Sequence, residues 1–247
     1  MLFRSLLGYV SNSEHTIEDM AGADFANFAE LSTKHGDGWG VAAIDNKNHS
    51  QLIVEPTRAK DSKRFREVTS SLKSDGALLH LRWATQGLPV TEGNSHPFTF
   101  GDISFMHNGD IKPANSLDPF IDPELKVAMR GDTDSERYFY SIISAIKRSN
   151  LIDGTLAAVR TIKKNLSYSS INAMLLTPEK YLVICEHNID RTPAGEGPEY
   201  YELYYRKDEK GILVSSTGWR QDGWAKIPNH SIAVIDRKNL TVEIRSI

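Results

Sequence analysis

The amino-acid sequence predicts an α+β fold in which two β-sheets share a covering of helices. Strand-like segments come first, a pair of amphipathic helices follows within residues 135–164, and strand-like segments return from Asn172 onward. A parallel, doubly wound sheet would instead alternate strand with helix along the whole chain. The chain has 247 residues, of which 40% are hydrophobic, so we expect a single domain, residues 1–247, with a substantial core.

The first half begins with a buried strand at Ser5–Val10. Thr16 is the expected N-cap of a helix over residues 17–34, because Asp19 completes a capping-box pattern three residues later. Further strands in this half are expected at Gly40–Asp45, Leu52–Glu55, Ala77–Trp83 and Ile103–His107. Helices are expected at Asp61–Leu72 and, for the amphipathic pair, at Ser135–Lys147 and Gly154–Lys164. The C-terminal strands are expected at Asn172–Thr177, Tyr181–Glu186, Tyr200–Arg206, Gly211–Ser215, Ser231–Asp236 and Thr241–Arg245, with a surface loop at Arg191–Pro198.

Charge and cysteine content narrow the class of protein. The formal net charge is −3, so no basic field favours nucleic acid or an anionic membrane surface. The single cysteine, Cys185, excludes an intrachain disulfide framework and fits a reducing compartment. The apolar start, Met1–Val10, is too short and interrupted for a signal peptide. We therefore expect a soluble cytoplasmic domain.

The segment His35–Gly40 (HGDGWG) is rich in glycine. A phosphate-binding loop would lead into a helix, whereas the following residues predict a strand, so nucleotide binding is disfavoured. A tight turn from helix to strand and a functional loop both fit this segment.

A second segment, Leu78–Gly87 (LLHLRWATQG), carries an arginine at the end of an apolar strand. Period-two alternation places Leu79, Leu81 and Trp83 on one face. His80 and Arg82 share the other face. The planar guanidinium of Arg82 suits a carboxylate ligand, and an internal ion pair is the structural alternative.

Two further segments place amide and acidic side chains at element boundaries. Asn108 and Gly109, expected at a strand end, offer the donors of an oxyanion hole, although Asn-Gly is also a common turn dipeptide. Thr133 and Asp134, in the segment GDTDSE, precede an apolar helix. Either residue fits an N-cap, and a carboxylate there also fits a ligand ammonium group.

Taken together, HGDGWG, HLRWAT, NSHP, HNG and TDSE resemble the class II glutamine amidotransferase domain in order and approximate spacing. The likeness is greatest to the stand-alone branch that includes the γ-glutamyl hydrolase of ergothioneine biosynthesis and a subunit of a fungal glutathione-degrading complex. It covers Leu6 to Glu136 firmly. The resemblance implies a four-layer αββα N-terminal-nucleophile hydrolase sandwich with two mostly antiparallel sheets.

The resemblance also implies an amino-acid site. Arg82 would bind the α-carboxylate of glutamine or of a γ-glutamyl group, and Asp134 would hold the α-ammonium group. Asn108 and Gly109 would form the oxyanion hole. Trp83 and Thr85 would line the site. No cofactor or metal is implied.

The catalytic residue of the family is missing. The family's chain begins with a cysteine four positions before a glycine, and its thiolate and free amino group carry the reaction. Here that glycine is Gly8, so Arg4 occupies the nucleophile position. Ser5 is one residue out of register, which turns a strand side chain to the opposite face, and its use would need cleavage after Arg4. Cys185 is expected to be a buried structural residue.

Three functions remain open from the sequence. The first is hydrolysis or transfer of the γ-amide of glutamine or a γ-glutamyl compound. The second is a non-catalytic glutamine or γ-glutamyl binding module, or a partner subunit, with a protein partner or homo-oligomer left open. The third is a metal hydrolase, which no recognised ligand spacing favours; its candidate ligands are His35, His80, His96 and His107.

Overall fold

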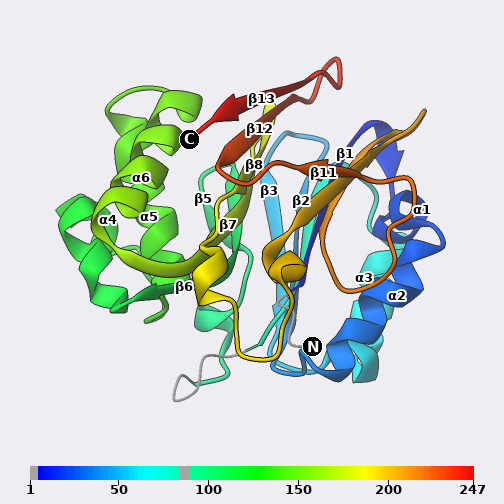
Figure 1. The fold of residues 1–247 in the computed structure, drawn as a ribbon. Coiled ribbons are helices and arrows are strands. Elements are labelled where there is room, and N and C mark those ends of the chain that lie inside the picture. Colours follow the sequence, from blue (N-terminus) through cyan, green and yellow to red (C-terminus); the bar gives the residue numbers. More distant parts are fainter. Residues whose placement is uncertain (1–4, 84–88) are drawn as a thin grey trace.

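The computed structural model describes residues 5–83 and 89–247, and it contains two stacked β-sheets between two helical layers (Figure 1). The seven-stranded sheet has the order β11-β9-β10-β1-β4-β2-β3, with β1 (Ser5–His15), β2 (Trp39–Ile44), β3 (Ser50–Glu55), β4 (Ser74–Leu81), β9 (Leu203–Lys207), β10 (Gly211–Ser216) and β11 (Ala225–Ile227). The six-stranded sheet has the order β13-β12-β8-β7-β6-β5, with β5 (Phe98–Phe100), β6 (Ile103–Lys112), β7 (Ser167–Leu176), β8 (Lys180–Cys185), β12 (Ser231–Asp236) and β13 (Val242–Ser246). The pairings between these strands are antiparallel, which confirms the predicted fold class.

The helices form the two outer layers (Figure 1). The seven-stranded sheet is covered by α1 (Ile17–Ala21), α2 (Asp24–Glu30) and α3 (Lys63–Ser71), and the six-stranded sheet by α4 (Pro123–Lys126), α5 (Asp134–Lys147) and α6 (Leu151–Asn165). Within the described residues, no helix is both long enough and apolar enough to cross a membrane.

Alternation along the strands divides the core into layers. Leu6 and Leu78 pack between the sheets with Met106 and Val183 of the six-stranded sheet. The next residue along each strand points to the opposite face of the sheet; Leu79, for example, packs toward α1–α3. A separate cluster joins α5 and α6 to the outer face of the six-stranded sheet. Polar side chains on the inter-sheet faces therefore lie in the middle layer, with one apolar cluster beyond each sheet.

The first predicted helix is interrupted. Thr16 is its N-cap and forms the predicted capping box, with its hydroxyl accepting from the Asp19 N–H at 3.0 Å. However, α1 ends at Ala21, and the chain resumes helical structure only in α2. Gly22 has a φ of +58° and its N–H donates to the Glu18 carbonyl oxygen at 2.8 Å, so it closes the first helix.

The C-terminal strands were predicted, but some of their boundaries were wrong: β7 begins at Ser167, five residues before the predicted Asn172. β9 begins at Leu203 instead of Tyr200, because Pro198–Tyr201 forms a 3-10 turn before it. The three-residue strands β5 and β11 were not predicted, since so short a segment cannot show a period-two pattern.

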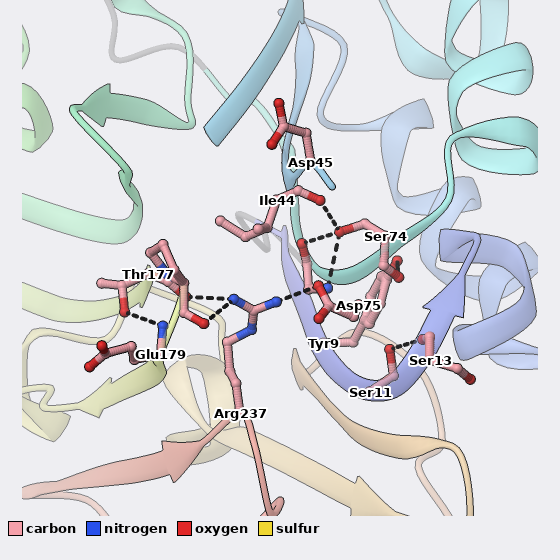
Figure 2. A network of polar contacts seen from close by, with 12 residues as sticks. Tyr9, Ser11, Ser13, Ile44, Asp45, Ser74, Asp75, Thr177, Glu179 and Arg237 are labelled. Carbon is pink, nitrogen blue, oxygen red and sulfur yellow. Dashed lines mark hydrogen bonds and ion pairs between the residues drawn. The ribbon is translucent and has the colours of Figure 1, made fainter. Parts of the chain in front are cut away.

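Arg237 joins the two sheets at the ends of β4 and β12 (Figure 2). Its Nη1 donates to the carbonyl oxygens of Thr177 and Pro178 at 3.0 and 2.6 Å, and its Nη2 pairs with the Asp75 carboxylate. Thr177 and Pro178 belong to the six-stranded side, whereas Asp75 lies on β4 of the other sheet. The buried guanidinium therefore links the two sheets through charge-assisted hydrogen bonds.

Replacing Arg237 with methionine is expected to lower the free energy of unfolding by about 2–4 kcal/mol, because two carbonyl groups lose their donor inside the protein. Asp75→Asn should cost less than about 1 kcal/mol, since the Asp75 side chain is 48% exposed. Urea denaturation of both variants measures the difference. If both variants lost the same small amount of unfolding free energy, Arg237 would not be an important link between the sheets.

Candidate functional site

The start of β1 and the end of β4 meet at one end of the sandwich. Ser5 is paired with Leu81, and Leu6 with His80. Arg82 follows and continues the ladder, because its N–H donates to the Gly38 carbonyl oxygen at 2.8 Å. The first residues of the chain that are described thus lie beside the candidate carboxylate-binding arginine.

The Arg82 side chain is buried at this end of the sheet, with 4% of its surface exposed. Leu79 and Leu81 pack toward the helices, as the alternation predicted, so Arg82 is on the inter-sheet side with His80. Its Nη2 donates to the Pro89 carbonyl oxygen at 3.1 Å. This bond ties the guanidinium to the segment that leads into β5.

Asn108 and Gly109 lie within β6, and the prediction that they form a strand end was wrong. They are paired with Asn172 and Ile171 of β7. Gly109 has a φ of +144°, and a Cβ there would lie 1.9 Å from the Ser170 carbonyl oxygen. Glycine is therefore required by backbone conformation and by the neighbouring strand, not by a turn.

Alternation along β6 directs Asn108 between the sheets and His107 toward α5. Met106, two residues before Asn108, belongs to the inter-sheet core. His107 Nε2 donates to the Ser170 carbonyl oxygen at 3.1 Å, and its Nδ1 lies 2.9 Å from Ser135 Oγ. The His107 ring therefore joins β7 to the N-terminus of α5.

Asp134 lies beside β6 at the first turn of α5. Thr133 is the N-cap, since its hydroxyl accepts from the Glu136 N–H at 3.1 Å. Asp134 itself is buried, and its Oδ2 accepts from the Ile111 N–H at 2.8 Å. The carboxylate is therefore held two residues beyond Gly109 on the same strand.

Asn94 connects the arginine to the aspartate, a role that sequence reasoning missed. Its Nδ2 donates to the Pro89 carbonyl oxygen, which also accepts from Arg82, at 3.2 Å. Its Oδ1 accepts from the Asp132 N–H at 3.0 Å, two residues before Asp134. The NSHP motif contained this residue, but no local pattern indicated its partners.

Glu136 was also missed, although it lies within the TDSE motif. Its carboxylate accepts from the N–H groups of Arg130 and Gly131 at 2.8 and 2.7 Å. Burial raises the pKa of the Glu136 carboxyl above its ordinary value, despite these two donors. Glu136 therefore shapes the loop that leads into α5 and does not face solvent.

The family model for class II glutamine amidotransferases matches residues 4–190, which include this constellation of Arg82, Asn108, Gly109 and Asp134. The chain belongs to this family.

Curated relatives of this glutamine amidotransferase domain are longer than the chain. A glutamine–fructose-6-phosphate aminotransferase of Acinetobacter baylyi is 32% identical over 130 residues, covering 51% of this chain and 20% of the relative. The corresponding enzyme of Rhizobium leguminosarum is 24% identical over 234 residues, covering 94% and 36%. A probable glutamine amidotransferase of Saccharomyces cerevisiae is 30% identical over 123 residues, covering 46% and 34%. The chain thus spans 20–36% of the length of these relatives.

Solved structures share the fold of this glutamine amidotransferase domain. A class II domain protein from Silicibacter pomeroyi superposes with a TM-score of 0.70 at 18% identity, covering 98% of this chain and 99% of that one. The glutamine phosphoribosylpyrophosphate amidotransferase of Bacillus subtilis gives a TM-score of 0.63 at 16% identity, covering 98% and 49%. At these identities the likeness concerns the fold.

Ser5 of the amidotransferase domain is bound to His35 of the HGDGWG segment. Their Oγ and Nδ1 atoms are 2.9 Å apart, and both side chains are buried. Ser5 shares the helix-facing side of β1 with Leu7. Trp83 packs edge-on against His35, with ring centroids 5.8 Å apart. The HGDGWG segment therefore supports the start of β1 from the helical layer, a contact that sequence reasoning missed.

Two predicted site residues, Arg4 and Thr85, lie outside the described residues. Cys185 is buried in the inter-sheet core, and burial raises the pKa of its thiol to about 12. The thiol is therefore protonated at neutral pH.

The four candidate metal ligands have different surroundings. His80 and His96 stack with ring centroids 4.3 Å apart, whereas His35 bonds to Ser5 and His107 to Ser135. Across residues 5–83 and 89–247, no group of three or more His, Cys, Asp or Glu side chains could hold a metal ion.

Proposed function

We propose that this chain recognises glutamine or a γ-glutamyl amide and binds it without hydrolysing the amide. The supporting observation is the link between Arg82 and Asp134: both are buried, and Asn94 joins the segments that carry them. A guanidinium and a carboxylate held in this way can take the two charges of an amino acid.

The oxyanion-hole residues would receive the amide carbonyl. Asn108 lies on the inter-sheet side of β6, and Asp134 is bonded to the same strand at Ile111. A ligand with its ammonium group at Asp134 would therefore extend toward Asn108 and Gly109. In the family's reaction, these donors stabilise the negative oxygen that forms when the amide is attacked.

The proposed loss of hydrolysis depends on the nucleophile position. Arg4 is expected to occupy it from the sequence, and a protonated guanidinium has no nucleophilic lone pair. The Ser5 hydroxyl is buried against His35 on the helix-facing side of β1. The buried, protonated thiol of Cys185 is a poor nucleophile.

We further propose that the chain forms one cytoplasmic domain over residues 1–247 and resembles the stand-alone branch related to the γ-glutamyl hydrolase of ergothioneine biosynthesis. The Silicibacter pomeroyi structure supports only the single-domain part of this proposal, because its fold superposes over 98% of this chain and 99% of that one. A partner subunit or a homo-oligomer would be compatible with a binding role.

Titration calorimetry of the full chain with L-glutamine tests the proposal, with an assay of glutamate release run in parallel. We expect saturable binding and glutamate release no faster than in buffer. Release that disappears in Arg82→Ala but persists after thiol alkylation would show catalysis by another nucleophile. Absence of binding would contradict the proposed recognition.

A further inference from the structure

A buried histidine, His187, lies on the six-stranded sheet close to the proposed oxyanion hole. It forms an isolated antiparallel bridge with Ser170 beyond the end of β8. Ser170 is in turn paired with Asp110 of β6, next to Gly109. The order β8-β7-β6 places His187 two strands from Gly109, a lateral separation of about 10 Å.

The His187 side chain faces the space between the sheets. Val183 and Cys185 of β8 pack in the inter-sheet core. Glu186 points to the opposite side, where it accepts from Lys163 Nζ of α6 at 2.9 Å. Alternation returns His187 to the inter-sheet side, which is the side on which Asn108 lies.

The His187 ring has hydrogen-bonding capacity that the described residues do not use. The side chain is 4% exposed, and its Nδ1 is buried without a hydrogen-bond partner among residues 5–83 and 89–247. Burial lowers the pKa of His187 to about 4, so the ring is neutral at pH 7. Burying a polar group without a hydrogen-bond partner is unfavourable, and a ligand group that bonds to this nitrogen would remove that cost.

Aromatic rings lie beside this imidazole. The Tyr201 ring is 6.0 Å from the His187 ring with a tilt of 37°, and Tyr200 packs edge-on against Tyr201 at 4.6 Å. Asn172 Nδ2 donates to the Tyr201 carbonyl oxygen, and Asn172 is the cross-strand partner of Asn108. The aromatic segment is therefore anchored to the strand next to the proposed oxyanion hole.

The topology gives a direction to a bound γ-glutamyl group. Arg82 is bonded to Pro89, in the segment that leads into β5, and Asp134 is bonded to Ile111 of β6. The amino-acid end thus lies on the β5 side of the site. In the sheet order β8-β7-β6-β5, the opposite side of β6 holds β7 and then His187.

We propose that His187 and Tyr201 receive the group attached to the γ-amide nitrogen, and that this group is a flat aromatic amine with a hydrogen-bonding substituent. The ring of Tyr201 would stack on it, and His187 would bond to its polar atom. This inference rests on the proposed function, since it assumes that Arg82 and Asp134 hold the glutamyl end.

Calorimetry on the full chain with three ligands tests the inference. The ligands are L-glutamine, γ-L-glutamylethylamide and γ-L-glutamyl-4-nitroanilide. We expect the nitroanilide to bind about 10-fold more tightly than glutamine, and the ethylamide to bind no more tightly than glutamine. In His187→Phe, which keeps a ring but removes both nitrogens, the nitroanilide advantage should fall by about 5–10-fold while glutamine affinity stays within about twofold.

His49→Phe is the matched control, because the His49 side chain is 64% exposed, and it should bind all three ligands as the parent does. His187→Gln keeps a donor and an acceptor, so it should still bind the nitroanilide more tightly than glutamine, by a smaller factor than the parent does. If His187→Phe fails to fold, the inference is tested by the order of the three affinities in the parent and by the nitroanilide affinity of His187→Gln. Glutamine binding without a nitroanilide preference, or an equal loss for both ligands in His187→Phe, would overturn this inference alone. Failure of all three ligands to bind the parent would overturn the proposed function as well.

Discussion

Glutamine should bind about 100-fold more weakly to Arg82→Ala than to the parent protein, a loss of about 3 kcal/mol. The guanidinium is buried, so its charge-assisted hydrogen bonds to a carboxylate are screened little by water. Arg82→Lys keeps the charge but loses the planar fork, and we expect an intermediate loss of about 10-fold. Titration calorimetry measures both values.

Two further variants separate ligand recognition from folding. Arg148→Ala removes an arginine whose side chain is 58% exposed, and it should leave glutamine affinity unchanged. Asp134→Asn keeps an oxygen that can accept from the Ile111 N–H, but removes the charge that would meet the ammonium group. We expect it to weaken binding by about 10-fold or more without a large loss of stability. Parent-like binding by Arg82→Ala would exclude Arg82 as the carboxylate ligand.

Gly109→Ala should lower the free energy of unfolding by about 3 kcal/mol or more. The added Cβ would lie 1.9 Å from the Ser170 carbonyl oxygen, so β6 and β7 would have to move apart. The φ of +144° adds backbone strain, since L side chains rarely adopt that conformation. Chemical denaturation followed by circular dichroism measures the loss.

Gly101→Ala provides a matched comparison just before β6. Gly101 also has a positive φ, +55°, but a Cβ there would meet nothing within 4 Å. We expect it to cost about 1 kcal/mol, from backbone strain alone. Equal losses in the two variants would mean that strand packing around Gly109 contributes nothing beyond its dihedral angle.

Most elements of the fold followed from local patterns. Alternation predicted the two faces of β4, because Leu79 and Leu81 pack toward the helices. The Thr16 capping box likewise appears as predicted, since its atoms lie within one turn of chain. Such features depend on neighbours in sequence, so they can be recognised without the rest of the molecule.

The prediction for Asn108 and Gly109 shows where local patterns are insufficient. Asn-Gly is favoured in turns, yet here it lies inside β6 because β7 pairs with it across the whole segment. The link from Arg82 to the loop before Asp134 likewise passes through Asn94, whose partners come from separate segments. Strand pairing and loop packing are long-range choices that a short sequence window does not contain.

The sequence by itself determined the α+β class and the family resemblance, and it predicted Arg4 at the nucleophile position, because each of these depends only on the order and type of residues. Only the tertiary structure decided that the Ser5 hydroxyl is bonded to His35 on the helix-facing side of β1. It likewise decided that His187 stands two strands from Gly109. These relations join residues that are distant along the chain, and they arise from strand pairing for His187 and from packing of the helical layer against β1 for Ser5 and His35.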